Sequence, residues 1–395
     1  MNHYLQQLNA CIHKPYRRII GLMAGTSLDG LDIALCKITG EGLRTKLKVE
    51  QFVTVPYEKA LREKLKQVFA QRQVDLQQVT LLHALLGRWY AKMILETLNR
   101  WKVIPTEIDC IASHGQTVYH APQRHHQLKD APNATLQLAD ADHIAHLTGI
   151  ITLSDFRQKH IAAGGEGAPL ALYGDYLLFS EASKDRILLN IGGIANFTLL
   201  PATKQTARPP VSTDVGPGNT LIDAAVQHYF PEQNFDTEGY IARRGTCHPF
   251  LLKELLQHPF FKQDIPKTTG QEMFPWAYVK QAQALSKSLQ ITPEDLLCTL
   301  THFTVEGIYQ HLLAYLTPQT EILASGGGVH NTFLMELLQQ KIASSIIKPL
   351  DSLGVTADAK EAALFAVLAN ETICGSSVNI TPTIPSIFMG KISLP

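Results

Sequence analysis

Residues 21–38 read Gly-Leu-Met-Ala-Gly-Thr-Ser-Leu-Asp-Gly-Leu-Asp-Ile-Ala-Leu-Cys-Lys-Ile, and they hold two apolar runs separated by a short polar turn. The turn has a glycine at each end, where the backbone can adopt a positive φ angle and approach a ligand closely. Thr26 and Ser27 add hydroxyl groups, whereas Asp29 and Asp32 add carboxylates that can hold Mg²⁺ through water. The stretch therefore predicts two strands joined by a turn that carries ligand-binding groups.

Backbone donors together with metal-binding carboxylates suit the phosphate groups of a ligand, so residues 25–30 are a candidate phosphate-binding turn. The turn is not a Walker loop, because no Gly-Lys-Ser or Gly-Lys-Thr follows it. The alternative is an ordinary β-hairpin with a polar tip, since short turns of glycine and aspartate commonly join paired strands. The residues of the turn alone leave both interpretations open.

The length and composition of the chain limit its class. At 395 residues the chain is long for one hydrophobic core and suits two domains. The 35 basic and 35 acidic side chains balance, which argues against a protein held to nucleic acid or to an anionic membrane by net charge. No apolar run reaches the length of a membrane span, and residues 1–15 lack the apolar segment of a signal peptide. Six scattered cysteines without a CxxC pair fit a reducing compartment, so we expect a cytoplasmic protein without nucleic-acid or membrane partners.

Strand and helix patterns alternate along the rest of the chain, which favours an α/β fold with largely covered sheets. Residues 186–200 form a second strand–turn–strand, which heads the second half of the chain as the first hairpin heads the first half. Residues 379–395 are expected to pack back on the first half. Helical periodicity is predicted at residues 57–72, 75–101, 136–148, 221–230, 249–258, 293–316, 331–343 and 358–370, and short buried strands at 108–113, 150–153 and 321–324.

Two segments of the second half carry candidate functional residues. Asp214 lies on a loop of glycine and proline directly before a predicted helix, so its carboxylate can face a ligand at the helix N-terminus, or it can stabilise the turn. Asn219 can cap the same helix. Gly326, Gly327 and Gly328 stand between a strand and a helix, where they permit close approach of a nucleotide base or ribose, although an ordinary strand–helix turn has the same composition.

Three further polar residues are candidates, each with a structural alternative. His114 follows a buried strand and is either a hydrogen-bonded structural residue or a residue that positions substrate. Arg157 is the stronger candidate for binding an anion, because a guanidinium group can bind a carboxylate or phosphate through two hydrogen bonds. Glu361 lies three residues after Asp358 at a predicted helix start, which is the pattern of a capping box as much as of a catalytic acid.

Eight sequence blocks, in order across nearly the whole chain, resemble those of the anhydro-N-acetylmuramic acid kinases, a family of the sugar kinase, heat-shock chaperone and actin superfamily. Separately most blocks are weak signals, and together they are highly specific. The blocks are residues 25–32 (GTSLDGLD), 113–122 (SHGQTVYHAP), 155–170 (DFRQKHIAAGGEGAPL), 190–198 (NIGGIANFT), 214–223 (DVGPGNTLID), 266–274 (PKTTGQEMF), 325–331 (SGGGVHN) and 358–365 (DAKEAALF).

The resemblance implies a two-domain, actin-like (ribonuclease H-like) α/β kinase fold with an active-site cleft between the domains. The first domain would hold residues 1–155 and 375–395, and the second residues 156–374. The resemblance also implies an ATP-dependent kinase that adds water at C1 of 1,6-anhydro-N-acetylmuramic acid, opens the anhydro bridge and phosphorylates O6. The product would be N-acetylmuramic acid 6-phosphate, formed in peptidoglycan recycling.

Site residues follow from the matching blocks. The resemblance implies ATP and Mg²⁺ as cofactors, with Asp29 as a ligand of the metal. It also implies a homodimer that binds two small molecules, the sugar substrate and ATP. Asp214 is the implied catalytic base and Glu361 a second catalytic candidate, with His114, Gln116, Thr117 and Arg157 at the sugar. The implied nucleotide-binding residues are Gly25, Thr26, Ser27, Leu28, Asp29, Gly30, Leu31, Asp32, Gly192, Gly193, Asn196, Gly216, Gly326, Gly327, Gly328 and Asn331.

The chain departs from the usual family pattern at several positions. Val215 stands where the family usually has threonine, which removes a hydroxyl group next to the proposed base. His160, Glu166 and Gln271 replace the usual Asp, Gln and Arg, and residues 381–383 read Thr-Pro-Thr in place of Thr-Gly-Ala. Two alternatives therefore stay open: a plain N-acetyl amino-sugar kinase without the hydrolytic step, and a catalytically inactive protein that binds a nucleotide or a muropeptide.

Overall fold

The computed structural model describes residues 2–168, 170–204, 208–375, 380 and 388–395. The departure noted at residues 381–383 therefore lies outside the described residues. Residues 2–375 supply all but one of the strands that follow, and the short C-terminal segment supplies the last.

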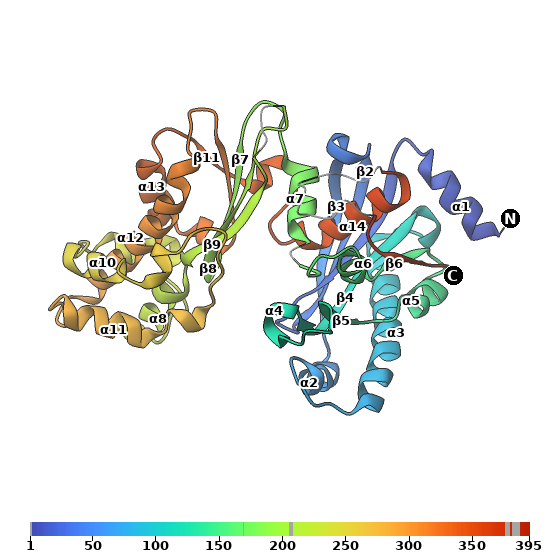
Figure 1. Ribbon diagram of the computed structural model, residues 1–395, viewed down its shortest axis with the longest axis horizontal. Coiled ribbons are helices and arrows are strands. Elements are labelled where there is room, and N and C mark those ends of the chain that lie inside the picture. The colour runs from blue at the N-terminus through green and yellow to red at the C-terminus, as the bar shows by residue number, and fades with distance from the viewer. Residues whose placement is uncertain (1, 169, 205–207, 376–379, 381–387) are drawn as a thin grey trace. The chain divides into compact units, whose positions relative to one another are not determined.

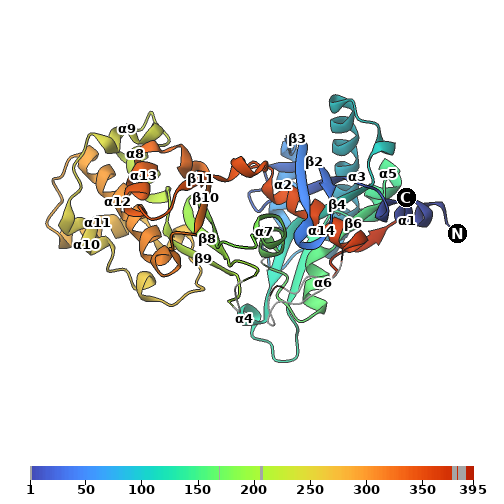
Figure 2. The same ribbon diagram turned by 90° about the horizontal axis from the view of Figure 1, so that it is seen from above.

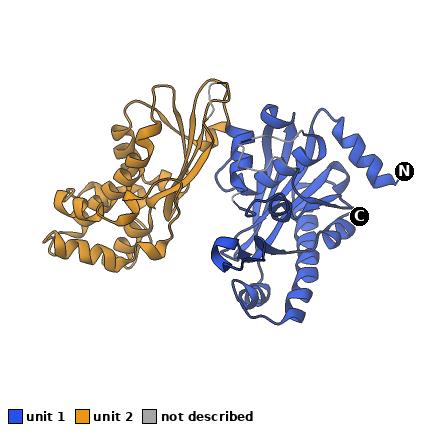
Figure 3. Cartoon of the chain, in the orientation of Figure 1, with its two compact units in different colours: residues 1–179, 354–395 blue, residues 180–353 orange. Residues whose placement is uncertain are grey.

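The chain divides into two compact units (Figure 3). Unit 1 comprises residues 1–179 and 354–395, and unit 2 comprises residues 180–353. The sequence placed the divisions after residues 155 and 374 instead. The difference arises because the helices of residues 156–162 and 360–374 pack on the sheet of unit 1, and the helix of residues 171–179 packs on the latter. Periodicity along the chain does not reveal these contacts.

Unit 1 is built on a seven-stranded sheet of order β12-β6-β4-β1-β2-β3, with β5 paired to β4. The first three strands form an antiparallel meander, and β4 and β6 run parallel to β1. β12 pairs antiparallel with β6, so the end of the chain returns to unit 1 as expected. The strands are β1 (Arg17–Ala24), β2 (Gly30–Thr39), β3 (Lys46–Pro56), β4 (Cys110–Ala121), β5 (Ala134–Leu138), β6 (Thr152–Ser154) and β12 (Lys391–Ser393).

Helices cover both faces of this sheet, which explains why β1 and β2 are almost continuously apolar (Figures 1 and 2). Ile20 and Leu22 of β1 join a buried cluster with Leu86 of α3, whereas Gly21 between them meets α14 on the other face. A Cβ atom at Gly21 would clash with the carbonyl oxygen of Ala362, so glycine is required for this close approach. The helices of unit 1 are α1 (His3–Ile12), α2 (Lys59–Val68), α3 (Leu76–Trp101), α4 (Gln123–His126), α5 (Ala141–Thr148), α6 (Phe156–Ala162), α7 (Ala171–Phe179) and α14 (Lys360–Cys374).

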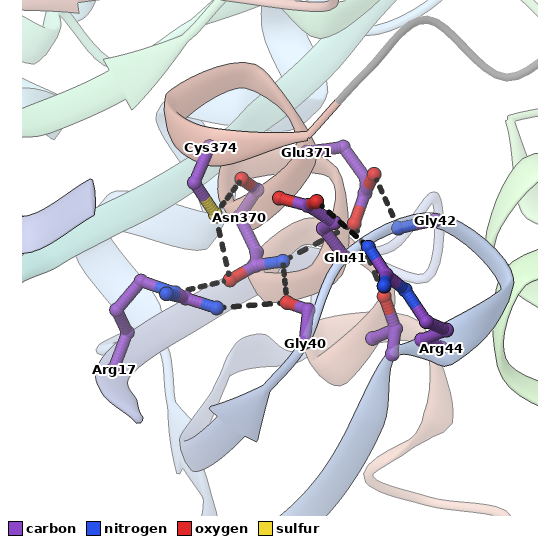
Figure 4. A network of polar contacts seen from close by, with 9 residues as sticks. Arg17, Gly40, Glu41, Gly42, Arg44, Asn370, Glu371 and Cys374 are labelled. Atoms are coloured by element: carbon purple, nitrogen blue, oxygen red, sulfur yellow. Dashed lines mark hydrogen bonds and ion pairs between the residues drawn. The ribbon is translucent and has the colours of Figure 1, made fainter. Parts of the chain in front are cut away.

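A buried polar network fastens the end of α14 to the first hairpins (Figure 4). The Arg17 Nε atom donates to Asn370 Oδ1 over 2.6 Å, and its Nη2 atom donates to the Gly40 carbonyl over 2.7 Å. Glu371 accepts a hydrogen bond of 2.9 Å from the Gly42 N–H. Each buried charge therefore has hydrogen-bonding partners, which ties the last helix to the strands of unit 1.

Unit 2 is built on a five-stranded sheet of order β11-β10-β7-β8-β9. β7, β8 and β9 form an antiparallel meander, and β10 and β11 run parallel to β7. Read from β9, this order repeats that of β3-β2-β1-β4-β6 in unit 1, so the predicted two-domain actin-like (ribonuclease H-like) fold is confirmed. The strands are β7 (Arg186–Ile191), β8 (Ile194–Leu200), β9 (Val211–Pro217), β10 (Glu321–Ser325) and β11 (Ile347–Pro349).

The core of unit 2 lies between this sheet and its helices, where Phe197 of β8 packs in one buried cluster with Val226 of α8 and Leu300 of α12. Thr292 caps α12 by accepting a hydrogen bond from the Asp295 N–H, and Pro293 follows at the first helical position. The helices are α8 (Thr220–Tyr229), α9 (Tyr240–Arg243), α10 (Pro249–Leu255), α11 (Trp276–Leu285), α12 (Pro293–Leu312) and α13 (Thr332–Lys341).

The predicted elements are largely confirmed, with two differences in unit 1. The predicted helix at 136–148 begins only at Ala141, because residues 134–138 form β5 against β4. The strand predicted to end at residue 113 continues to Ala121 as β4. Among the described residues, no helix is both long and apolar enough to cross a membrane.

Candidate active site

The turn of residues 25–30 joins β1 to β2, as predicted. Leu28 adopts a positive φ of 56° and its side chain is buried, which turns the neighbouring side chains outward. Thr26, Ser27 and Asp29 are exposed. The turn thus presents two hydroxyl groups and one carboxylate to solvent on a tightly bent backbone.

The two glycines of the turn have different roles. A Cβ atom at Gly30 would lie 2.6 Å from the Val55 carbonyl oxygen, so this glycine is required by the pairing of β2 with β3. A Cβ atom at Gly25 would meet nothing nearer than the Ser27 Oγ atom at 3.5 Å. Gly25 therefore leaves open space for a ligand, whereas Leu31, which is fully buried, can contribute only its main chain.

The carboxylates of this turn fit a divalent cation. Ser27 Oγ donates to Asp29 Oδ1 over 2.6 Å, and Thr54 Oγ1 donates to Asp32 Oδ1 over 2.6 Å. Burial raises the pKa of Asp32, the hydrogen bond from Thr54 opposes the shift, and the charges of Asp29 and Asp358 raise it further. Among the described residues no group of three metal-ligating side chains occurs, but Mg²⁺ in kinases is usually held by one or two carboxylates and the phosphates of the substrate.

Gln116 supports the turn from below. Its side chain is fully buried, and Nε2 donates to the Gly25 carbonyl over 2.9 Å. Tyr57 donates its hydroxyl hydrogen to Gln116 Oε1 over 3.2 Å and is itself 2.7 Å from the Tyr90 hydroxyl. The family resemblance implied that Gln116 binds the sugar, whereas in the structure its amide donates a hydrogen bond to the turn. The supporting roles of Tyr57 and Tyr90 were not predicted from the sequence. Thr117 is only half-buried and accepts a hydrogen bond from Gln137.

His114 and Arg157 are brought together in unit 1. Arg157 Nε donates to His114 Nε2 over 2.8 Å, and its Nη1 atom donates to the Gly167 carbonyl over 3.2 Å. Burial lowers the pKa of His114 to about 3, and the charge of Arg157 lowers it further. His114 is therefore a neutral acceptor that orients Arg157, which is the structural alternative considered for it.

Glu361 interacts electrostatically with Arg157 and with Asp32 of β2. Desolvation raises the pKa of Glu361, Lys360 and Arg157 oppose that shift, and Asp32 adds to it. The capping-box interpretation of Glu361 is wrong, because α14 begins after Ala359 and has no side-chain cap. Ala359, and not Asp358, precedes the helix, so the Glu361 carboxyl is not used in a capping box and is available for a ligand.

In unit 2, Gly192 and Gly193 form the turn between β7 and β8, which is anchored to the loop before α8. The Gly192 carbonyl accepts a hydrogen bond of 2.8 Å from Asn219, and the Gly193 carbonyl accepts hydrogen bonds from Gly218 at 2.8 Å and Thr220 at 3.2 Å. A Cβ atom at Gly218 would clash with the Gly192 carbonyl oxygen. The two loops are therefore packed backbone to backbone.

Asp214 lies within β9, opposite Asn196 of β8, and not on a loop as predicted. Its Oδ2 atom accepts a hydrogen bond of 2.8 Å from the Thr269 N–H, and its Oδ1 atom has no hydrogen-bond partner among the described residues. Burial raises the pKa of Asp214, and the bond from Thr269 partly opposes the shift. One carboxylate oxygen is thus fixed while the other is free to accept a proton.

The neighbours of Asp214 in the chain are structural. Val215 is 1 % exposed and belongs to the apolar core of unit 2, so a hydroxyl group there would not face the same side of the strand as the Asp214 carboxylate. Gly216 has a φ of 129°. The predicted capping role of Asn219 is wrong: its backbone is α-helical, and its side chain makes no capping hydrogen bond to α8.

The Asn219 side chain instead lines a cavity of about 400 Å³ within unit 2. Gly326 has a φ of 86°, and a Cβ atom there would lie 2.6 Å from Asn190 Oδ1, whereas Gly327 faces the cavity with open space around it. Asn331 also lines the cavity, but its Oδ1 atom caps α13. The cavity is lined by Asn219, Ile222, Asp223, Phe235, Asp236, Glu238, Gly327, His330 and Asn331.

Several of these lining residues were not found from the sequence. Asp223 belongs to a matching block but has no signal of its own, because an acidic residue on a helix is ordinary. Phe235 and Glu238 lie on a connection without periodicity. These two residues meet Asp223 and Gly327 only through the fold, since the connection, α8 and the turn after β10 are separate segments of the chain.

The two domains share one strand order, and each begins with a hairpin that has a glycine turn. Together with the partly free carboxylate of Asp214 on β9, these features describe an actin-like sugar kinase. The sequence model of the family described as anhydro-N-acetylmuramic acid kinase matches residues 17–386. The chain belongs to the anhydro-N-acetylmuramic acid kinase family.

Similar proteins agree with this assignment. The chain is 49% identical to a protein of Pseudoalteromonas atlantica named anhydro-N-acetylmuramic acid kinase, with 100% of both chains covered. It is 47% identical to a protein of the same name from Pseudoalteromonas translucida, covering 100% of this chain and 99% of the other. A third, from Caldanaerobacter subterraneus, is 36% identical, with 99% of this chain and 100% of the relative covered.

Proposed function

We propose that the protein is an ATP-dependent kinase that opens 1,6-anhydro-N-acetylmuramic acid with water and phosphorylates O6, giving N-acetylmuramic acid 6-phosphate for peptidoglycan recycling. Membership of the kinase family supports the reaction class. The observation that carries the hydrolytic step is the Asp214 carboxylate: the Thr269 N–H fixes one oxygen, and the other has no hydrogen-bond partner within the described ranges.

Asp214 is the proposed general base. Water is a poor nucleophile, so a carboxylate must accept a proton from it while its oxygen bonds to C1. Burial raises the pKa of Asp214, which makes the ionised carboxylate a stronger base than an exposed aspartate. The hydrogen bond from Thr269 orients the group without neutralising it.

The bond between C1 and O6 breaks as the water oxygen bonds to C1, and O6 takes the γ-phosphoryl group of ATP while ADP leaves. Transfer of the phosphoryl group to O6 stabilises this leaving oxygen, so no strong separate acid is needed. Glu361, whose pKa is raised by desolvation, and Arg157 are proposed to hold the sugar. His114 would act through Arg157 as a positioning residue.

The phosphates of ATP are proposed to lie against the turn of residues 25–30. Gly25 leaves room there for a ligand, and Thr26 and Ser27 are exposed beside it. Asp29, with Asp32 behind it, fits a Mg²⁺ ion, which when bound neutralises phosphate charge during transfer. Gly192, Gly193 and Asn196 are proposed to serve the same nucleotide from unit 2.

The nucleoside end of ATP is proposed to occupy the cavity of unit 2. Three acidic side chains, Asp223, Asp236 and Glu238, line it, and the described lining residues include neither lysine nor arginine. Such a lining repels phosphate groups and suits an uncharged group rich in hydrogen-bond donors. Gly327 leaves open space at the wall, which supports the predicted close approach of a base or ribose.

A cytoplasmic location and a homodimeric state complete the proposal. ATP is available in the cytoplasm, and all six cysteines are free thiols, as a reducing compartment requires. Sedimentation of the purified protein would test the dimer directly: a mass of one chain across micromolar concentrations would contradict it.

Product analysis tests the proposed reaction. The enzyme should convert ATP and the anhydro sugar to a ring-opened 6-phosphate, identified by mass spectrometry and phosphorus–proton NMR. Phosphorylation of free N-acetylmuramic acid with no use of the anhydro sugar would favour a plain amino-sugar kinase. Binding of ATP without turnover of either sugar would favour an inactive binding protein.

A further inference from the structure

Residues 267–269 of unit 2 lie along the edge of β9 and contact Asp214 there. β9 is the last strand of its sheet, so among the described strands it has a partner on one side only. On the other side, the Asp214 N–H donates to the Lys267 carbonyl over 3.0 Å, and the Thr269 N–H donates to Asp214 Oδ2 over 2.8 Å. The segment of residues 267–269 therefore holds both the main chain and the carboxylate of the proposed base.

The Thr213 hydroxyl completes the attachment of this segment to β9. Thr213 is 4 % exposed, and its Oγ1 atom accepts a hydrogen bond of 3.0 Å from the Lys267 N–H. The same oxygen lies 3.2 Å from the Lys267 carbonyl oxygen and 3.1 Å from that of Asp214, and its one proton can be donated to either. One side chain thus takes the place that a second main-chain pair has in a regular ladder.

The Lys267 side chain fixes the segment to the core of unit 2. Lys267 is 7 % exposed, and its Nζ atom donates to the carbonyls of Phe260 over 2.7 Å and Gln263 over 3.0 Å. The same atom lies 4.3 Å from the centroid of the Phe260 ring, which is fully buried in the core cluster. Displacing Lys267 would leave these carbonyls without their donor, so the ammonium group resists movement of the segment.

The segment influences the ionisation of Asp214 through the Thr269 N–H. Burial raises the pKa of Asp214, and the hydrogen bond from Thr269 lowers it. Such a bond favours the ionised form of a carboxyl group. The charged and titratable neighbours of Lys267 are Asp264, which opposes the lowering of the Lys267 pKa by burial, and His311.

We propose that Lys267 and Thr213 are positioning residues for the reaction, because they fix residues 267–269 against β9. The Thr269 N–H then holds one oxygen of Asp214 and leaves the other for the attacking water. This inference rests on the proposed function, since it assumes that Asp214 is the general base. Without this support the carboxylate can rotate, and a misplacement of about 1 Å can lower turnover by about hundredfold.

Thr213→Val and Thr213→Ser form the test pair, since valine keeps the shape of the side chain without the hydroxyl and serine keeps the hydroxyl. In Thr213→Val we expect kcat with the anhydro sugar to fall by about tenfold to hundredfold. The acidic limb of the pH–kcat profile should move up by about one pH unit, because Asp214 loses part of the bond that lowers its pKa. KM for ATP should change by less than about twofold. Thr213→Ser should restore kcat and the position of the limb.

A second variant and a second measurement make the test independent of one substitution and of turnover. Lys267→Met removes the ammonium group, keeps an unbranched side chain, and should move the acidic limb in the same direction. Hydrogen–deuterium exchange followed by mass spectrometry reports the attachment of the segment directly. Peptides that cover residues 267–270 should exchange about tenfold faster in Thr213→Val than in the unaltered protein.

Thr198→Val is the matched control, because Thr198 is also buried in this sheet and its hydroxyl donates to Ser212 instead of to the segment. It should change neither the exchange of residues 267–270 nor the acidic limb. An unmoved limb in folded Thr213→Val, or an equal loss of activity in Thr213→Ser, would overturn the proposal. Absence of turnover of the anhydro sugar in the unaltered protein, with exchange still faster in Thr213→Val, would instead contradict the proposed function.

Discussion

The two glycine turns, residues 25–30 in unit 1 and Gly192–Gly193 in unit 2, occupy the same place in two sheets of the same strand order. The first turn exposes hydroxyl and carboxyl side chains and is supported by one buried amide, that of Gln116. The second carries no side chains, and its carbonyl oxygens are bonded to the loop that precedes α8.

The difference shows that one strand topology can support two kinds of turn. In unit 1 the turn itself carries the groups that suit phosphate and metal. In unit 2 the turn has only its main chain to offer a ligand, and its carbonyl oxygens anchor residues 218–220, where β9 leads into α8. The proposed catalytic group, Asp214, lies within β9, the strand that leads into this anchored segment, and not on the turn.

The largest expected effect concerns Asp214 on β9 of unit 2. Asp214→Asn keeps the size of the side chain and the hydrogen bond from Thr269, but it cannot accept a proton. Turnover should fall by about 10²–10⁴-fold, the usual contribution of a general base, with little change in nucleotide affinity. Steady-state kinetics and ADP titration measure the two quantities. Near-normal turnover in a correctly folded variant would exclude Asp214 as the base and direct attention to Glu361.

A smaller effect is expected in the turn of unit 1. Asp29→Asn should weaken use of Mg·ATP by on the order of 10–100-fold, because the lost carboxylate orients the metal and its water. Raising the Mg²⁺ concentration should restore part of the activity. Kinetics with ATP and Mg²⁺ varied independently would check this, and unchanged constants would remove Asp29 from the metal site.

Alanine substitutions should distinguish the close backbone packing at the unit 2 turn from the open backbone of the unit 1 turn. Gly218→Ala forces a Cβ atom against the Gly192 carbonyl and should destabilise the protein by about 1–3 kcal/mol. Gly25→Ala, where a Cβ atom has open space, should leave the melting temperature nearly unchanged. Thermal melts of the two variants test the contrast, and equal destabilisation would mean that both turns are packed alike.

The smallest effect concerns the stability contributed by Asp223. Its pKa is about 6 in the folded protein against an ordinary value of 3.8, so the folded state binds the proton more tightly. Ionisation of Asp223 therefore lowers the free energy of unfolding as the pH rises from 3.8 to about 6, and above pH 6 this destabilisation is complete. Asp223→Asn should raise the free energy of unfolding by on the order of 1 kcal/mol at pH 8, after allowance for partial solvent screening.

The same substitution should give little gain at about pH 3, where Asp223 is mostly protonated in both the folded and the unfolded state. Denaturant unfolding of the ligand-free protein at the two pH values measures the difference. A gain of the same size at both would show that the effect is not due to the charge.

Features set by neighbouring residues in the chain could be predicted from the sequence. Glycines between apolar runs indicate both hairpins. The Gly/Pro composition drew attention to Asp214 but predicted a loop where the chain forms β9. The sequence could not show whether Asn219 caps α8, because that depends on a contact with a distant segment. The Asn219 N–H donates to the Gly192 carbonyl, and α8 begins without a capping hydrogen bond from the Asn219 side chain.

Features set by contacts between distant segments could not be predicted. The placement of α14 in unit 1 depends on the space above Gly21, and the support of the first turn depends on Tyr57 and Gln116 meeting below it. The inward direction of Val215 depends on the pairing of β9 with β8. Each follows from the fold, and none leaves a periodic signal along the chain.

The central claim, that water opens the anhydro bridge with Asp214 as base, is tested most directly by isotope labelling. The reaction is run in H₂¹⁸O, and the 6-phosphate product is quenched and analysed at once by mass spectrometry. The account predicts one ¹⁸O atom at C1 and none in the phosphoryl group, above the exchange shown by unlabelled product kept in the same water for the same time. Phosphorylated product without ¹⁸O at C1 would contradict it.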